Sequence, residues 1–269
     1  MRVGILTSHE IRHRYFVHAL AKSFDVVAVG VQDTGYVPAR DHGATIDEQT
    51  ARVLSRHFND RVRTEQALFG HDATPLDDRQ PFAVLPIAPS ELNSSRTVEF
   101  LRRREVDVVL VYGTGLVKDP LLSAYAGRMI NLHLGLSPYY RGTATNFYPL
   151  VNDEPEYVGA TIHLIDAGID SGPILHHARP EIVADDMPHT VGCKAILAGI
   201  DKVSLSLHEF ETSRLQPVPQ WQPANARLYL RKDYHPSQVV RLYELIEAAL
   251  FLQYVQRAAT VAPMVTLVP

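Results

Sequence analysis

Short apolar runs alternate with amphipathic helical stretches in the first half of the chain, and this alternation most constrains the fold. The runs RVGILT (2–7), DVVAVGV (25–31) and VDVVLVY (106–112) have the length and β-branched content of buried strands. Helical patterns at 9–24 and 90–104 separate them. Such alternation predicts an α/β fold with a doubly wound, mostly parallel sheet.

The second half continues with apolar segments at 129–133, 159–166 and 173–183, which we interpret as neighbouring strands at the far side of the sheet. A long amphipathic pattern at 188–207, with Asp186 as its N-cap, predicts the helix that closes the domain.

Two regions fall outside this alternation. Residues 32–88 hold a charged helical stretch and a polar loop, and we expect them to form an insertion beside the sheet. Residues 213–269 begin with a proline-rich linker and continue as one strand and one helix, the latter at 235–257. The expected division is a catalytic domain at 1–212 and a small C-terminal extension at 213–269.

Composition narrows the class of protein. The 269 residues are 46% hydrophobic and carry a net charge of −4, which is typical of a soluble globular chain and gives no field to hold a polyanion. The single cysteine, Cys193, cannot form an intramolecular disulfide and fits the core of a protein in a reducing compartment. No signal peptide and no run of about 18 apolar residues is visible. We therefore expect a cytoplasmic protein without a nucleic-acid or membrane partner; a homodimer is left open.

The glycine pattern does not favour a dinucleotide site. The first strand is followed by TSHE, and Gly113-Thr114-Gly115 lacks the third glycine of G-x-G-x-x-G. These glycines are as well explained by a turn after the strand.

An amide, an imidazole and a carboxylate are placed to meet in one pocket. Asn131 and His133 are two positions apart on a strand and therefore project from the same face. Asp170 lies in a loop between Gly168 and Gly172, where α/β enzymes place their working groups. Each alone could be structural, as a strand-end histidine or a turn residue, but together they suggest acid–base chemistry.

Over residues 85–185 the chain resembles the folate-dependent formyltransferases, which include glycinamide ribonucleotide, methionyl-tRNA and sugar N-formyltransferases. The shared motifs are VDVVLVYGTG, AYAGRMINLH, SPYYRG and DAGIDSG. The resemblance implies a Rossmann-like core and catalytic roles for Asn131, His133 and Asp170. The segment Leu136-Ser137-Pro138 replaces a commoner Ser-Leu-Leu-Pro, a departure more similar to the sugar-modifying and amino-acid-modifying branches.

The resemblance also implies 10-formyltetrahydrofolate as co-substrate, with the folate ring against Val111, Tyr112, Gly113, Thr114, Gly115, Leu116 and Val117. Asp166 is a further candidate for folate binding, although an Asx turn explains it equally well. No metal is expected, because the sequence has no H-E-x-x-H or paired-cysteine ligand set.

Two segments could hold the acceptor. His9, Arg12 and His13 follow the first strand and could contact an anionic group, although such residues are commonly a solvated helix start. In the loop after His133, Arg141 and Gly142 could anchor the acceptor, while Tyr139 and Tyr140 could stack on a ring or pack in the core.

The expected activity is formyl transfer to a primary amine, with a nucleotide-linked amino sugar or an amino-acid-like amine as acceptor. Three alternatives remain. Hydrolysis of 10-formyltetrahydrofolate is disfavoured because the first strand begins at Arg2 without a preceding regulatory domain. Methionyl-tRNA formylation is disfavoured by the short C-terminal extension and the absence of basic charge. The third is a non-catalytic binding domain of the same fold.

Overall fold

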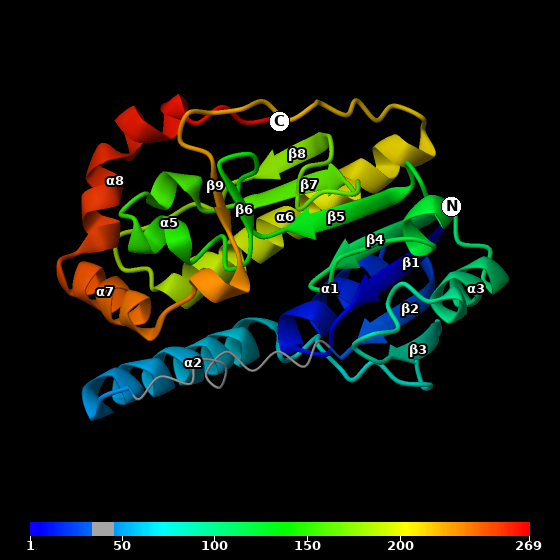
Figure 1. Cartoon of the computed structure of the whole chain (residues 1–269), viewed down its shortest axis with the longest axis horizontal. Coiled ribbons are helices and arrows are strands. Elements are labelled where there is room, and N and C mark those ends of the chain that lie inside the picture. Colours follow the sequence, from blue (N-terminus) through cyan, green and yellow to red (C-terminus); the bar gives the residue numbers. More distant parts are fainter. Residues whose placement is uncertain (34–45) are drawn as a thin grey trace.

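A seven-stranded sheet with the order β3-β2-β1-β4-β5-β7-β8 forms the centre of the protein (Figure 1). The computed structural model describes residues 1–33 and 46–269. The strands are β1 (Arg2–Thr7), β2 (Asp25–Gln32), β3 (Ala83–Ile87), β4 (Val108–Tyr112), β5 (Met129–His133), β7 (Ala160–Leu164) and β8 (Ile174–Ala178). In the sheet, β3, β2, β1, β4 and β5 are parallel to one another. Strand β7 pairs antiparallel with both β5 and β8. The expected doubly wound α/β class is confirmed.

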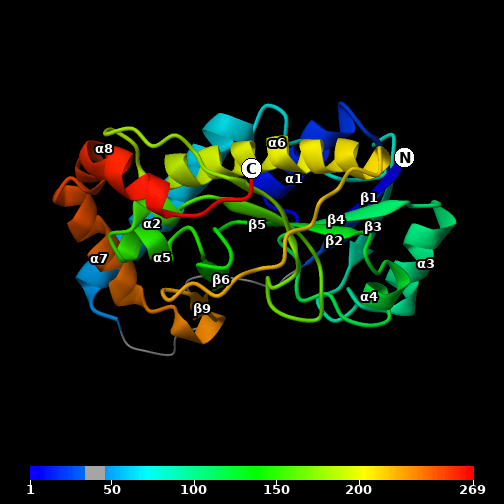
Figure 2. The same cartoon turned by 90° about the horizontal axis from the view of Figure 1, so that it is seen from above.

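Helices cover both faces of the sheet, which explains why a central strand such as β4, with the sequence VVLVY, is apolar on both faces. Helices α1 (Ile11–Ala21) and α6 (Pro188–Glu211) lie on one face, and α3 (Ser95–Arg103) and α4 (Leu121–Ala124) lie on the other (Figure 2). Within β4, Val108 and Leu110 pack towards α1 and α6, while Val109 and Val111 pack towards α3 and α4. This alternation follows from the two-residue period of a strand.

The region at 32–88 differs from the expected insertion beside the sheet. Its helix, α2 (Glu48–Phe69), is capped by Asp47, whose carboxylate accepts a 2.9 Å hydrogen bond from Thr50 N. Its end, β3, forms the edge strand of the sheet itself and pairs in parallel with β2. The sequence AVLPI is too short and too interrupted by proline to distinguish an edge strand from a loop. The expected start of the charged stretch, Thr45, lies outside the described residues.

The C-terminal part also differs from its prediction. A short strand, β9 (Arg227–Tyr229), pairs in parallel with β6 (Tyr140–Gly142), in the segment that follows β5. Instead of one helix there are two, α7 (Pro236–Glu247) and α8 (Leu250–Val261). The break lies at Ala249, whose φ of 65° is incompatible with a continuous right-handed helix. The hydrophobic pattern continues through the break, so the pattern gave no warning of it.

Smaller elements complete the chain. Helix α5 (Tyr148–Val151) follows the loop after β6, and 3-10 turns occupy Pro155–Tyr157, Arg231–Asp233 and Ala262–Met264. Helix α3 starts after Ser94, later than the start of the helical pattern expected at 90–104. The N-cap position of α6 is Met187, and Asp186 instead accepts hydrogen bonds from Val183 N and Thr190 Oγ1. Among the described residues, no helix is both long and apolar enough to cross a membrane.

Candidate active site

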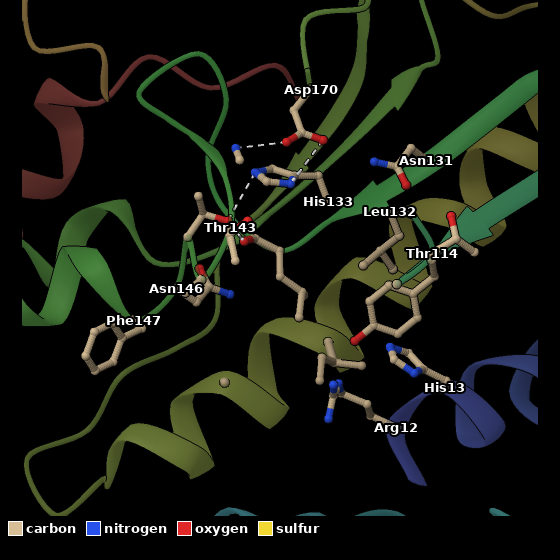
Figure 3. A pocket seen from close by; sticks show the side chains of 18 of the residues that line it. Arg12, His13, Thr114, Asn131, Leu132, His133, Thr143, Asn146, Phe147 and Asp170 are labelled. Carbon is tan, nitrogen blue, oxygen red and sulfur yellow. Dashed lines mark hydrogen bonds and ion pairs between the residues drawn. The ribbon is translucent and has the colours of Figure 1, made fainter. Parts of the chain in front are cut away.

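The three residues predicted to act together do meet, at the carboxyl end of β5. His133 Nδ1 lies 3.4 Å from Asp170 Oδ1, and Asn131 lies two positions before His133 on the same strand. Figure 3 shows the side chains of Asn131, His133 and Asp170 gathered along one side of a pocket. His133 is almost fully buried, so its ring position is set by neighbouring groups and not by solvent.

Both ring nitrogens of His133 face hydrogen-bond acceptors. Nε2 lies 3.1 Å from the Tyr140 carbonyl oxygen and 3.3 Å from Thr145 Oγ1, whose hydroxyl donates to the Leu134 carbonyl. Nδ1 faces the Asp170 carboxylate. Burial lowers the pKa of His133 below its ordinary value, and Asp170 opposes that shift. The imidazole is therefore neutral at rest. The Asp170 carboxylate and the Tyr140 carbonyl favour its protonated form, against the larger effect of burial.

Asp170 remains ionised. Burial would raise the pKa of this carboxyl, but His133, His163 and the Gly142 N–H outweigh burial and hold the pKa well below its ordinary range. The Gly142 N–H donates a 2.9 Å hydrogen bond to Asp170 Oδ2. Asp170 has a φ of 46°, a left-handed conformation that few residue types adopt readily, and Gln220 donates to its carbonyl at 2.8 Å. Strain of this kind is retained where the surrounding contacts enforce it.

His163 of β7 belongs to the same cluster. It lies directly opposite Asn131 across the antiparallel pair β5–β7. His163 Nδ1 is 2.8 Å from the Leu164 carbonyl and therefore donates to it, which leaves Nε2 to accept a 3.0 Å bond from Asn131 Nδ2. This contact orients the Asn131 amide and leaves one of its two amide hydrogens for a ligand.

A cavity of about 790 Å³ runs past the ends of β1, β4 and β5. All of the residues expected to contact folate line it: Val111, Tyr112, Gly113, Thr114, Gly115, Leu116, Val117 and Asp166. Gly113 has a φ of 75°, and a Cβ there would lie 2.2 Å from His13 Nε2, so this turn requires glycine. Asp166 accepts hydrogen bonds from Gly168 N and Ser171 Oγ and so also closes its own loop.

The far side of the cavity carries a buried network of charges at the start of α1. Arg12 donates to Glu65 Oε1 at 2.9 Å and to Glu10 Oε2 at 2.6 Å. Burial would raise the pKa of Glu10, but contacts with His13 and Arg12 lower it to about 2. Burial, together with Arg12, lowers the pKa of His13 to about 4. Arg12 and His13 do line the cavity, but the positive charge of Arg12 is already neutralised by two carboxylates.

Four of the residues expected to contact the acceptor do not line the cavity. His9 is exposed on the surface. Tyr140 is fully buried, with its hydroxyl donating to Glu154 and its ring stacked on Tyr229. Tyr139 is also buried, and Arg141 lies outside the lining, whereas the neighbouring Gly142 is part of it. The tyrosines therefore pack the loop in place, because β9 brings Arg227 and Tyr229 against them, a contact that local sequence does not reveal.

Several lining residues had no sequence signal that would have identified them. They come from α1, α2, α6 and the loop after β6, and include Glu10, His57, Arg61, Glu65, Asn146 and His189. Glu65 and His57 face the cavity only because α2 packs against α1 and α6. Within residues 1–33 and 46–269, no group of three or more His, Cys, Asp or Glu side chains is placed to hold a metal ion.

Comparison with known proteins agrees with this geometry. Residues 37–197 match the model of the family described as formyl transferase. Methionyl-tRNA formyltransferase of Microcystis aeruginosa is 32% identical over 128 residues, covering 47% of this chain and 39% of that protein. The chain spans less than half the length of the curated relatives that it matches.

Two solved structures share the fold. Phosphoribosylglycinamide formyltransferase from Anaplasma phagocytophilum has a TM-score of 0.57 at 15% identity, over 86% of this chain and 98% of the other. A sugar N-formyltransferase from Shewanella has a TM-score of 0.56 at 17% identity, over 90% and 88%. The family match covers more than half of the sequence and contains Asn131, His133 and Asp170, and on this ground the chain belongs to the formyl transferase family.

Proposed function

We propose that this protein transfers the formyl group of 10-formyltetrahydrofolate to a primary amine. The observation that carries the proposal is the meeting of Asn131, His133 and Asp170 beside the 111–117 segment, in one cavity of a formyl transferase domain. An oxygen-stabilising amide, a neutral imidazole and an ionised carboxylate are the groups that acyl transfer to an amine needs.

The 111–117 segment fits a flat ring. Val111 and Val117 give it buried apolar walls, Gly113 and Gly115 bring main-chain groups to the surface, and Leu116 is exposed at the rim. A slot with apolar walls and main-chain polar groups suits the pterin of a folate. When bound there, the folate supplies a formyl carbon on a nitrogen leaving group.

Each side chain of the cluster then has a defined task. Attack by the amine places negative charge on the formyl oxygen, and the amide hydrogen that Asn131 does not give to His163 can donate to it. The neutral His133 takes the proton that the amine loses, and the Asp170 carboxylate opposes the effect of burial on the pKa of the ring. His133 then returns the proton to the folate nitrogen as the bond between that nitrogen and the formyl carbon breaks. Asp170 stabilises that imidazolium; its lowered pKa makes it a poor base in its own right.

A small amine is the acceptor that we favour, either a nucleotide-linked amino sugar or an amino-acid-like amine. The cavity is enclosed by α2, α6 and the loop after β6, and its free volume suits a ligand of that size. Methionyl-tRNA is a second candidate, because curated relatives at about 30% identity carry that name. The net charge of −4 argues against a nucleic-acid acceptor.

The test is to incubate the protein with 10-formyltetrahydrofolate and a panel of amines, including amino sugar nucleotides, amino acids and initiator methionyl-tRNA. We expect tetrahydrofolate release to depend on one class of amine, whose mass increases by one formyl group. Equal release without any amine would identify a hydrolase. No release with any acceptor, together with no rise in melting temperature on adding a folate analogue, would refute the proposal.

A further inference from the structure

Two histidines from different helices face each other in the cavity, away from the catalytic cluster. His57 of α2 and His189 of α6 have ring centroids 4.5 Å apart, and both line the cavity. Phe147, at the end of the loop after β6, packs edge-on against His57 at 6.0 Å. The same loop begins at Gly142, whose N–H donates to Asp170. Five residues of chain therefore connect the catalytic cluster to the residue that packs on the histidine pair, a span of at most about 18 Å.

The two rings carry unused hydrogen-bonding capacity. His57 Nδ1 and His189 Nε2 are buried without a partner among the described residues, and the His57 side chain as a whole is only 8% exposed. Unpaired buried ring nitrogens are costly and call for an explanation, of which a missing ligand is one. Gly192, one turn after His189, also lines the cavity, and a Cβ there would meet nothing within 4 Å, so the space beside the pair is open.

Positive charge is available at the same place. Arg61 lies one helical turn after His57 on α2 and lines the cavity with it. Its Nε is 3.8 Å from Glu65 Oε1, but Glu65 is already bound by Arg12 at 2.9 Å. Arg61 is thus the less engaged of the two arginines around Glu65. His189 stands in the first turn of α6, the positive end of that helix.

We propose that His57, Arg61 and His189 form a subsite for a phosphoryl group of the acceptor. The subsite deepens the formyl-transfer function proposed above and rests on it for the identity of the ligand as acceptor. Three donors from two helices suit a tetrahedral oxyanion with several free oxygens better than a planar carboxylate with two. His57 is almost fully buried and is reached only through the cavity. A small phosphorylated amine can therefore reach it, whereas the backbone of a folded nucleic acid cannot.

Anion binding at this place is coupled to protons. Burial is the largest cause that lowers the pKa of His57 to about 3 and of His189 to about 4, so both rings are neutral before binding. A bound dianion favours the protonated rings, so binding should strengthen as the pH falls from neutral towards these values. The other ionisable groups around the pair come from α2, α7 and the turn at 231–233; they are Arg56, Asp60, Arg61, Glu65, Arg231 and Tyr243.

The test uses sulfate, a tetrahedral dianion that does not itself titrate in this range, and pyrophosphate, with acetate as the planar comparison. Calorimetry of the whole protein at pH 8 and at pH 6 gives the affinity at each pH. We expect sulfate and pyrophosphate to bind, sulfate to bind more tightly at pH 6 than at pH 8, and acetate to bind much more weakly. His57→Gln, His189→Gln and Arg61→Gln should each weaken binding by about tenfold, the effect of one lost charge-assisted hydrogen bond.

The matched control is Arg63→Gln, on the same helix with a side chain that is 81% exposed, which should leave binding unchanged. Absence of sulfate and pyrophosphate binding, or sulfate binding that does not strengthen at pH 6 in the unaltered protein, overturns the subsite even if a histidine variant fails to fold. Formyl transfer is measured separately with the amine panel. Anion binding without formyl transfer would refute the proposed function but not the subsite. Formyl transfer without anion binding would refute the subsite but not the proposed function.

Discussion

The two walls of the cavity are built in different ways. The strand-end wall consists of Asn131, His133, His163 and Asp170, and main-chain groups of β6 and β7 hold most of its side chains. The helical wall consists of Glu10, Arg12, His57, Glu65 and His189, and its contacts are mainly between side chains.

The two walls should therefore differ in the amino-acid substitutions that they tolerate. Main-chain partners move little, so the strand-end wall holds a fixed geometry for chemistry that is shared by a family. Side-chain partners can be exchanged together without rebuilding the sheet, so the helical wall is the part in which acceptor specificity can change. Four predictions test this contrast.

The largest effect is expected at the strand-end wall. Asn131→Ala, His133→Ala and Asp170→Asn should each lower the rate of formyl transfer by 10² to 10³, about 3 to 4 kcal/mol in the barrier. The double variants should be hardly slower than the singles, since the three groups act on one centre. Steady-state release of tetrahydrofolate measures the rate, and melting temperature checks folding. His71→Ala, at a side chain that is 98% exposed, is the control, and near-normal turnover in His133→Ala would contradict the mechanism.

In the helical wall the larger effect should fall on stability. Arg12→Met removes the main counter-charge of Glu10 and Glu65 and leaves only the more distant Arg61, and we expect the free energy of unfolding to fall by about 2 to 3 kcal/mol. The triple variant Glu10→Gln/Arg12→Met/Glu65→Gln should recover much of that loss, because the two carboxylates are neutralised together with the arginine. Urea unfolding measures both.

Arg52→Met serves as the comparison, since its ion pair with Glu48 is exposed and should contribute nothing measurable. If the triple variant were no more stable than Arg12→Met, the uncompensated charge would not be the cause of the loss.

Acid should weaken the helical wall before the strand-end wall. Burial lowers the pKa of His57 to about 3 and of His13, His177 and His189 to about 4, below the value of about 6.5 for an unfolded chain. Between those values the unfolded state binds more protons than the folded state, so stability is present above pH 6.5 and is lost as the pH falls towards 4. Three of the four residues line the cavity on its helical side.

The measurement is the urea midpoint at pH 7, 6 and 5, which should fall with each step. His57→Gln should flatten the dependence, whereas exposed His71→Gln should not. An unchanged midpoint between pH 7 and pH 5 would show that these rings are not held neutral.

The smallest effect is expected behind the helical wall, at the break between α7 and α8. Ala249 has a left-handed conformation that glycine adopts at no steric cost, so Ala249→Gly should raise the free energy of unfolding by a few tenths to about 1 kcal/mol. Ala258→Gly, within the right-handed α8, should lower it by about 1 kcal/mol. Thermal unfolding distinguishes the two signs, and a loss of stability in both variants would argue against a fixed break at residue 249. Formyl transfer should be unchanged in both, since neither residue lines the cavity.

The strand-end wall was largely readable from sequence because its members are close along the chain and follow a strand period. Asn131 and His133 share a face by spacing alone, and the Gly168 and Gly172 loop brings Asp170 to them. Local sequence does not place His163 in this wall, because only the register of β5 against β7 shows that it faces Asn131. Tyr139 and Tyr140 were open between stacking and packing, and the pairing of β6 with β9 buries them.

By itself, the sequence determined the α/β class, the parallel start of the sheet and the meeting of Asn131, His133 and Asp170, because each depends on local periodicity and short connections. Tertiary structure alone decided the helical wall. Glu10, His57, Glu65 and His189 are separated by up to 179 positions and meet only through the packing of α1, α2 and α6. Long-range packing of side chains leaves no periodic trace in the sequence. The pairing of charges and the unpaired ring nitrogens of the helical wall could therefore be seen only in the folded protein.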